Sequence, residues 1–236
     1  MAGRAQMQPE DTVILEGVYL LDSLDVPVPA RAPLNIHSTI RKSSSMQGLN
    51  PAFAFASRLH ALTGRDILLV VNARGGSSLS QWLKGAQRQS FSERSDDLQG
   101  RFGPLIPSFY DEAVRRCRAA MEYGTLRAIL WHQGESDATE QKAAVYLERL
   151  SAFADDLRED LDAPEVPFVV GETNPLMESS AIINPVLRQV PDVIPHSACV
   201  SAEGCGVNDD NLHFNRDGQI LLGSRYADAV LDFLDL

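Results

Sequence analysis

Cysteine is scarce in this sequence, with Cys117, Cys199 and Cys205 the only three among 236 residues. So few thiols at such uneven spacing exclude a disulfide framework and a zinc knuckle. Cys199 and Cys205 could pair in an oxidising compartment, but we expect free thiols. The chain also lacks nucleotide-binding glycine patterns and any histidine–cysteine cluster with metal-ligand spacing. These absences favour hydrolysis without a cofactor or a metal.

Basic residues are outnumbered, because 21 Lys and Arg face 32 Asp and Glu and the net charge is −11. Nucleic acids and anionic membrane surfaces attract basic surfaces, so we expect neither as a partner and favour a neutral ligand. No apolar run approaches the roughly 20 residues of a membrane-spanning helix. Residues 1–11 lack the apolar centre of a signal peptide. If Met1 is the true start, a cytoplasmic location follows, whereas a leader upstream of it would permit export. No feature indicates a particular oligomeric state.

Strand and helix patterns alternate along the chain. Apolar runs predict strands within 12–21 and at 67–71, 126–131, 166–170 and 198–201, with 67–71 buried on both faces. Capping residues and 3.6-residue apolar spacing predict helices at 51–63, after Ser108, at 139–161, at 182–190 and after Asn215. Residues 22–50 and 84–104 carry no predicted element. This alternation predicts one α/β domain over residues 1–236, with three layers and a parallel sheet.

Polar clusters follow the predicted strands or precede the last helix, at 72–78, 132–137, 171–174 and 209–215. The cluster at 132–137, His-Gln-Gly-Glu-Ser-Asp, is unusual because a buried strand that ends in so many polar groups must find partners for all of them. In open parallel sheets, ligands bind beyond the carboxyl ends of the strands. We therefore expect the four clusters to meet at one edge of the sheet and form an active site.

Asp210 and His213 are the most specific pair within these clusters. Their three-residue spacing lets a carboxylate fix the tautomer of the imidazole, so that the other ring nitrogen can act as a general base. The same two residue types also serve as simple caps at a helix start, and the pair alone does not separate the two uses. Glu135 could orient His213 in place of Asp210, or bind a hydroxyl of the substrate.

Gly75 and Gly76 could present backbone N–H groups to an oxyanion, although a flexible turn is the more common use of two glycines. The side-chain amide of Gln133 could donate to the same oxyanion. Arg74 and Trp82 are predicted at the rim of the binding site. We expect His132 to be a structural hydrogen-bonding residue and Trp131 to lie in the core.

Three motifs together resemble a known family. They are Trp131-His-Gln-Gly-Glu-Ser-Asp137, Asn72-Ala-Arg-Gly-Gly-Ser77 and Asp210-Asn-Leu-His213-Phe214. Spread over nearly the whole chain, they are similar to the sialate O-acetylesterase-like branch (carbohydrate esterase family 6) of the SGNH hydrolases. The resemblance implies a flavodoxin-like αβα sandwich that removes acetyl groups from sugars through a serine acyl-enzyme, without a cofactor. It leaves open which acetylated sugar is the substrate.

Carried over to this chain, the resemblance makes His213 the general base and Asp210 its partner. Gly75 or Gly76 would supply oxyanion donors together with Gln133. Glu135 would be a supporting or alternative acid.

The nucleophile of the family is the serine of a Gly-Gln-Ser-Asn turn, usually followed by Met-Ala-Gly-Arg or a close variant. This chain begins Met1-Ala2-Gly3-Arg4, so the resemblance places the nucleophile and its strand directly upstream of Met1. Ser77, Ser78 and Ser136 are not expected to replace it, because a serine needs a well-placed base to become a nucleophile.

Three expectations follow for the 236 residues themselves. They should have little or no esterase activity, lowered stability and a tendency to aggregate through exposed strand edges. The alternative is a carbohydrate-binding pseudoenzyme of the same fold that binds glycans without turnover. A weaker alternative is a lipase or thioesterase of the wider SGNH group.

Overall fold

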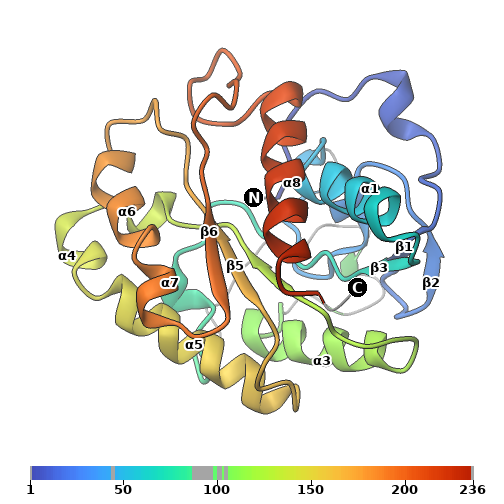
Figure 1. Cartoon of the computed structure of the whole chain (residues 1–236), viewed down its shortest axis with the longest axis horizontal. Coiled ribbons are helices and arrows are strands. Elements are labelled where there is room, and N and C mark those ends of the chain that lie inside the picture. Colours follow the sequence, from blue (N-terminus) through green and yellow to red (C-terminus); the bar gives the residue numbers. More distant parts are fainter. Residues whose placement is uncertain (1, 44–45, 87–97, 100–102, 104–105, 235–236) are drawn as a thin grey trace.

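Two three-stranded sheets organise the computed structural model, which describes residues 2–43, 46–86, 98–99, 103 and 106–234 (Figure 1). The first sheet has the strand order β2-β1-β3, and the second has the order β4-β5-β6. The strands are β1 (Val18–Leu21), β2 (Pro27–Pro29), β3 (Ile67–Leu69), β4 (Ile129–Trp131), β5 (Phe168–Gly171) and β6 (Ser197–Val200). Neighbouring strands are parallel except for β1 and β2, which are antiparallel.

Strand β2 departs from the expected all-parallel sheet, and it lies within the stretch 22–50, where no element was predicted. Its residues are Pro27, Val28 and Pro29, and it pairs only with β1. Proline cannot donate to a strand ladder, so it is tolerated at the edge of a sheet. A strand with two prolines is therefore invisible to a search for apolar alternation but physically acceptable as an edge.

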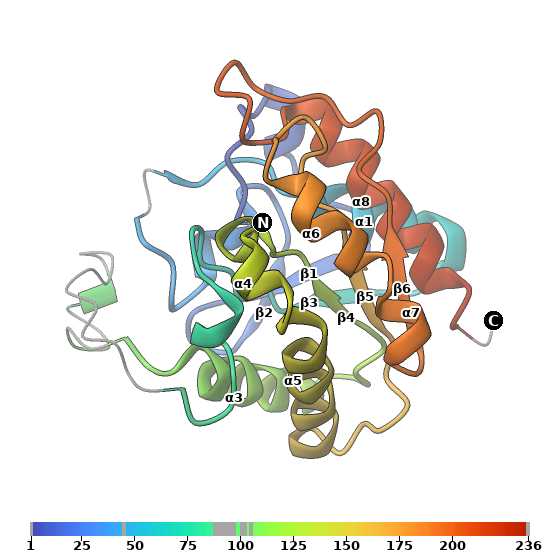
Figure 2. The same cartoon turned by 90° about the vertical axis from the view of Figure 1, so that its left-hand side faces the viewer.

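Helices cover both faces of the strands (Figures 1 and 2). They are α1 (Pro51–Thr63), α3 (Phe109–Met121), α4 (Glu140–Ala143), α5 (Tyr146–Asp160), α6 (Ser180–Leu187), α7 (Val190–Val193) and α8 (Arg216–Leu231). Successive side chains of β5 alternate between two apolar cores. Val169 faces the core shared with α1 and α8, whereas Phe168 and Val170 face the core shared with α3, α5, α6 and α7. The predicted three-layer sandwich is confirmed.

The predicted helix boundaries rest on capping residues that the structure places as expected. Gly64 ends α1 in the left-handed conformation, at φ +65°. Ser108 accepts the Asp111 N–H at the start of α3, and Asn215 accepts the Gly218 N–H at the start of α8. The predicted helix 139–161 is two helices. A hydrogen bond that spans three residues, from the Val145 N–H to the Lys142 carbonyl, ends α4 before α5 begins.

Strands β3 and β4, each at one edge of its sheet, are less buried than their sequences suggest. Ile67 and Leu68 of β3 and Ile129 and Leu130 of β4 are only half-buried, whereas every residue of β5 is buried. Strand β5 has neighbours on both sides, whereas β3 and β4 each pair along one edge only within the part of the chain that the structure describes. Strand β5 is therefore the strand that is buried on both faces, and the prediction that 67–71 is buried on both faces is wrong.

The prediction for 84–104 falls mostly on residues outside the described part. Within the described ranges, no helix is both long enough and apolar enough to cross a bilayer.

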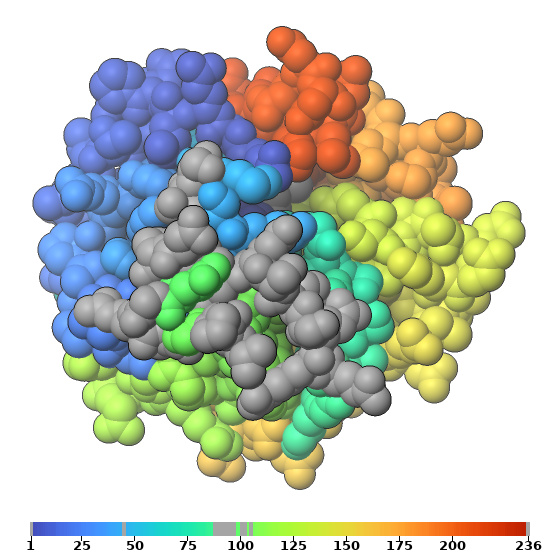
Figure 3. Space-filling view, turned by 180° about the vertical axis from the view of Figure 1, so that it is seen from behind, coloured from blue at the N-terminus to red at the C-terminus, as the bar shows by residue number. Residues whose placement is uncertain are grey.

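A partly buried ion pair holds the N-terminal segment against α8. Asp11, in the 3-10 helix Pro9–Thr12, accepts bonds from Arg216 Nε (2.8 Å) and Arg216 Nη2 (2.7 Å), and also from the Gln8 N–H. Figure 3 shows the N-terminal segment (dark blue) beside the orange-red segment that precedes α8. The bond from Arg216 holds the pKa of Asp11 below its usual value, against the opposing effect of burial.

Asp11→Asn is expected to lower the free energy of unfolding by about 1–3 kcal/mol near neutral pH, because it removes a charge-assisted bidentate pair. The folded-state pKa of Asp11 is depressed, so its contribution is complete above the unfolded-state value near 4 and is lost as the pH falls through the folded-state value. Urea denaturation should show the difference between wild type and variant shrinking below about pH 4. Asp217→Asn is the control, since that carboxylate is 90% exposed and 3.9 Å from Arg216. A difference that is independent of pH would contradict this account.

Candidate active site

The predicted polar clusters meet at one edge of the sheets. Gln133 Nε2, after β4, donates to the Ser77 carbonyl, after β3, at 3.0 Å. The Leu79 N–H donates to Asp137 Oδ2 at 2.8 Å and joins the same two loops. The expectation that these clusters converge is confirmed for this pair.

Two further contacts extend the connection. A Cβ atom at Gly134 would lie 3.0 Å from the Thr173 methyl group, so the loops after β4 and β5 are in close contact. Asn174 Nδ2 donates to the Asn211 carbonyl at 2.8 Å and joins the loop after β5 to the turn before α8. All four clusters therefore form one continuous surface at the carboxyl ends of the strands.

Asp210 and His213 are in direct contact. His213 Nδ1 lies 2.7 Å from Asp210 Oδ2, and Asp210 Oδ1 accepts the N–H groups of Leu212 and His213, each at 2.9 Å. The His213 backbone N–H is the main cause that lowers the pKa of Asp210, followed by the His213 ring and the Leu212 N–H. A charged Asp210 keeps the proton on Nδ1, so Nε2 is left as a proton acceptor. The His213 side chain is 24% exposed, which leaves it accessible to a reacting group.

Glu135 occupies a different position. It opens the 3-10 helix Glu135–Asp137 and is half-buried. Among the described residues, its carboxylate has no hydrogen-bond or ion-pair partner. Of the two acids proposed to orient His213, Asp210 is the one that touches it.

Hydrogen bonds from Asn35 and Ser38 hold the glycine loop after β3, and few described atoms lie near the Cα atom of Gly75. Asn35 donates to the Ala73 carbonyl and accepts the Ala73 N–H, both at 3.3 Å, and Ser38 Oγ donates to the same carbonyl. A Cβ atom at Gly75 would meet only the Ala2 methyl group within 4 Å, at 3.9 Å. Gly76 has φ +68°, a conformation that favours glycine. A Cβ atom at Gly76 would lie 3.2 Å from Lys42 Nζ. Backbone N–H groups that are held in place are what an oxyanion site requires.

Gln133 is engaged within the protein. Its Nε2 donates to the Ser77 carbonyl and to Asp137 Oδ2 (2.6 Å), while its Oε1 accepts the Tyr146 hydroxyl at 2.9 Å. Both amide hydrogens are used in this structure, so Gln133 links the two loops here, and its role as an oxyanion donor stays a prediction.

Arg74 and Trp82 are buried, with 7% and 6% exposure. The Arg74 guanidinium donates to the Ile40 carbonyl at 2.7 Å and lies over the Phe109 ring. Trp82 packs on Phe109 and Trp131 and donates its N–H to Ser77 Oγ. The apolar core between α3 and β4 extends beneath this loop, so the predicted position at a rim is wrong for both residues.

A family model matches residues 1–232 of the sequence; its description is SASA, a carbohydrate esterase, sialic acid-specific acetylesterase. The chain belongs to this family. It is 27% identical over 190 residues to a probable carbohydrate esterase of Arabidopsis thaliana. That match covers 78% of this chain and 64% of the length of the plant protein.

Solved structures share the fold of this esterase-family chain. The Arabidopsis thaliana protein has a TM-score of 0.81 at 23% identity, covering 99% of this chain and 94% of the other. NanS has a TM-score of 0.68 at 15% identity, covering 98% and 92%. A carbohydrate acetylesterase from Xanthomonas citri has a TM-score of 0.61 at 18% identity, and the match covers 92% of this chain and 48% of the Xanthomonas citri chain.

His132 and Trp131 of the esterase-family motif are structural, as predicted. The Tyr226 hydroxyl donates to the Trp131 carbonyl at 3.0 Å, so its oxygen accepts from His132 Nδ1, also at 3.0 Å. Burial lowers the pKa of His132 well below its usual value and keeps the ring neutral. The Trp131 ring lies in the core and donates to the Tyr146 hydroxyl.

The serines of the glycine loop are bonded within that loop. Ser77 Oγ donates to the Arg74 carbonyl at 2.9 Å and accepts the Trp82 N–H. Ser78 Oγ lies 2.9 Å from Ser80 Oγ. Within the described residues, neither hydroxyl touches His213.

The other ionisable groups form no metal site within the described ranges, where no three His, Cys, Asp or Glu side chains come together. All three cysteines are free thiols. Burial raises the pKa of Cys117 to about 11 and that of Cys199 to about 12, so both remain protonated.

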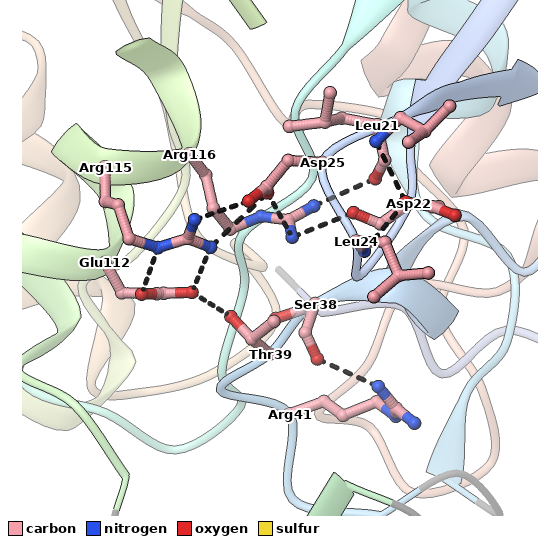
Figure 4. A network of polar contacts seen from close by, with 11 residues as sticks. Leu21, Asp22, Leu24, Asp25, Ser38, Thr39, Arg41, Glu112, Arg115 and Arg116 are labelled. Carbon is pink, nitrogen blue, oxygen red and sulfur yellow. Dashed lines mark hydrogen bonds and ion pairs between the residues drawn. The ribbon is translucent and has the colours of Figure 1, made fainter. Parts of the chain in front are cut away.

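A charge network joins α3 to the end of β1 and to Thr39, beside the segment that bonds to the glycine loop (Figure 4). Arg116 of α3 is fully buried and donates to the carbonyls of Leu21 (2.8 Å) and Asp22 (3.0 Å), at the end of β1. Glu112, one turn earlier, accepts the Thr39 hydroxyl at 2.6 Å. Thr39 follows Ser38, which bonds to Ala73 in the glycine loop. Nothing in the sequence indicates this role, because Arg116 stands beside Arg115 in an ordinary amphipathic pattern.

Proposed function

We propose that this chain supplies the general base and the oxyanion-binding loop of a carbohydrate O-acetylesterase. The observation that carries the proposal is the contact between Asp210 and His213 at the sheet edge where the glycine loop also lies. A charged acid on Nδ1 and an accessible Nε2 are what a serine esterase needs in its base. Membership of the carbohydrate esterase family supports a sugar ester as the substrate.

In the proposed reaction, His213 Nε2 takes the proton of a serine hydroxyl as the serine oxygen attacks the acetyl carbonyl. The N–H groups of Gly75 and Gly76 stabilise the negative oxygen that forms. When the tetrahedral intermediate collapses, the sugar oxygen leaves and takes the proton from His213. Water then attacks the acetyl-serine with the same base and releases acetate. No step requires a metal or a cofactor.

We further propose that the nucleophilic serine lies in a Gly-Gln-Ser-Asn turn directly upstream of Met1. Two features support this assignment. Ala2 lies against Gly75, so the start of the described chain is already at the glycine loop. Among the described residues, strands β3 and β4 each have one edge without a partner strand, and an additional strand could pair there. On this proposal the 236 residues alone are catalytically deficient, whatever their affinity for sugars.

The test compares hydrolysis of an aryl acetate by the 236-residue chain and by a chain extended upstream with an apolar strand that ends in Gly-Gln-Ser-Asn. We expect background rates from the former and a rate at least about 10⁴-fold higher from the latter, since loss of a serine nucleophile costs about 10⁶ in a related triad. The control is the same extension with alanine in place of its serine. A folded extended chain that binds acetylated sugars without turnover would overturn the proposal and favour a binding pseudoenzyme.

A further inference from the structure

We propose that Asn174 is a positioning residue that fixes the turn carrying Asp210 and His213 to the end of strand β5. The role in catalysis rests on the proposed function of His213 as the base. The contact itself is a property of the chain and does not depend on that proposal.

The Asn174 side chain is fully buried and uses both of its polar ends. Nδ2 donates to the Asn211 carbonyl at 2.8 Å and reaches the Leu212 carbonyl at 3.5 Å. Oδ1 accepts the Leu176 N–H at 2.9 Å, which fixes the amide orientation. The two carbonyls belong to the residues immediately before His213, so Asn174 acts on the backbone that sets the position of the base.

The turn 208–213 is largely exposed, and most of its other hydrogen bonds among the described residues are to its own segment. The Asn211 N–H donates to the Asn208 carbonyl (2.9 Å), and the Asn208 N–H donates to the His213 carbonyl (2.8 Å). A bridge between Val207 and Phe214 closes the base of the turn. Among the described residues, Asn174 is the one side chain from outside 206–215 that hydrogen-bonds to 208–213.

The platform on the other side of this contact is rigid. Strand β5 is buried along its whole length, and Thr173, which follows it, is also fully buried. Figures 1 and 2 show the segment after β5 and the turn before α8 next to each other at the same end of the sheets. A buried amide that joins the end of β5 to an exposed turn fixes the turn relative to that strand. The glycine loop follows β3 of the other sheet, and Gln133 after β4 bonds to it.

Asn174→Asp tests this role with little change in shape. It keeps the acceptor for the Leu176 N–H but replaces the Nδ2 donor with an oxygen that faces the Asn211 carbonyl. Asn184→Asp is the matched control. Asn184 is also buried, and its side chain bonds to Thr173 N–H and Thr173 O, each at 3.0 Å, without contact with the turn.

The first readout is amide hydrogen exchange in the 236-residue chain, followed by NMR. Asn174→Asp should speed exchange of the Leu212 and His213 amides by about tenfold or more, because the turn then opens independently of the sheet. The exchange rate of the Val170 amide in β5 should change by less than about twofold, once the effect of each variant on global stability is subtracted. Asn184→Asp should leave the turn amides protected. Unchanged exchange at Leu212 and His213 in Asn174→Asp overturns the proposal.

The second readout is kinetic, in the upstream-extended chain. Asn174→Asp should lower kcat by about 10- to 100-fold with KM changed less than about twofold, since a misplacement of about 1 Å can cost that much. An unchanged kcat alongside faster exchange would show that the turn needs no anchor for catalysis and would overturn the positioning role. If the extended chain without substitution has no turnover, the proposed function fails instead. The exchange result then decides alone whether Asn174 holds the turn.

Discussion

His213→Ala in the upstream-extended chain is expected to lower kcat by about 10⁴- to 10⁶-fold, the scale of losing the base of a serine triad. The reason is geometric, because His213 lies at the edge where the polar clusters meet, with its Nδ1 held by Asp210 and its side chain accessible. The measurement is the initial rate of aryl acetate hydrolysis at saturating substrate. A variant that keeps the wild-type rate would remove His213 from the mechanism.

Two carboxylate variants sharpen the same experiment. Asp210→Asn should cost about 10⁴-fold, since an amide in place of the carboxylate no longer favours the proton on Nδ1. Glu135→Gln should cost less than about tenfold, because Glu135 does not touch His213 and a substrate contact alone is worth less. The reverse order would assign the orienting acid to Glu135.

Arg116→Met is expected to lower the free energy of unfolding by about 3–5 kcal/mol, the largest stability effect we expect from one substitution. Methionine keeps the apolar stem but removes the Arg116 donor from the buried Leu21 carbonyl. It also removes one of two donors from the Asp22 carbonyl, which keeps the Asp25 N–H, and it takes one of two cations from Asp25. Urea denaturation measures the loss.

Arg115→Met is the neighbouring control. Arg115 pairs with Asp25 and Glu112, but its side chain is 47% exposed, so its removal should cost about 1 kcal/mol or less. Equal losses from the two variants would show that burial of Arg116 is not what makes the network strong.

Local patterns in the sequence predicted the parts of this molecule that depend on neighbours along the chain. Ser108, Gly64 and Asn215 mark helix ends through bonds that span three or four residues, and all three were found where their residue types indicated. The Asp210–His213 contact is also local, because the two residues are three positions apart in the sequence. The convergence of the clusters followed from one general property of parallel sheets.

Contacts between distant segments were not predictable in the same way. The Gln133 amide was predicted to donate to an oxyanion, because nothing in the sequence shows that it bonds to Ser77 and Tyr146. Arg74 and Trp82 were predicted at the rim of the binding site, because their neighbours in the sequence are polar and give no sign that both side chains are buried. Asn174 lay inside a predicted cluster, but its partner Asn211 is 37 residues away.

The proposed activity is the removal of acetyl groups from sugars by a serine that the Asp210–His213 pair activates. The most direct measurement is acetate release from an O-acetylated sugar by the upstream-extended chain, followed over many turnovers. We predict continuous release that requires both the serine of the extension and His213. Saturable binding of the acetylated sugar by a folded extended chain, with no acetate released, would contradict the claim.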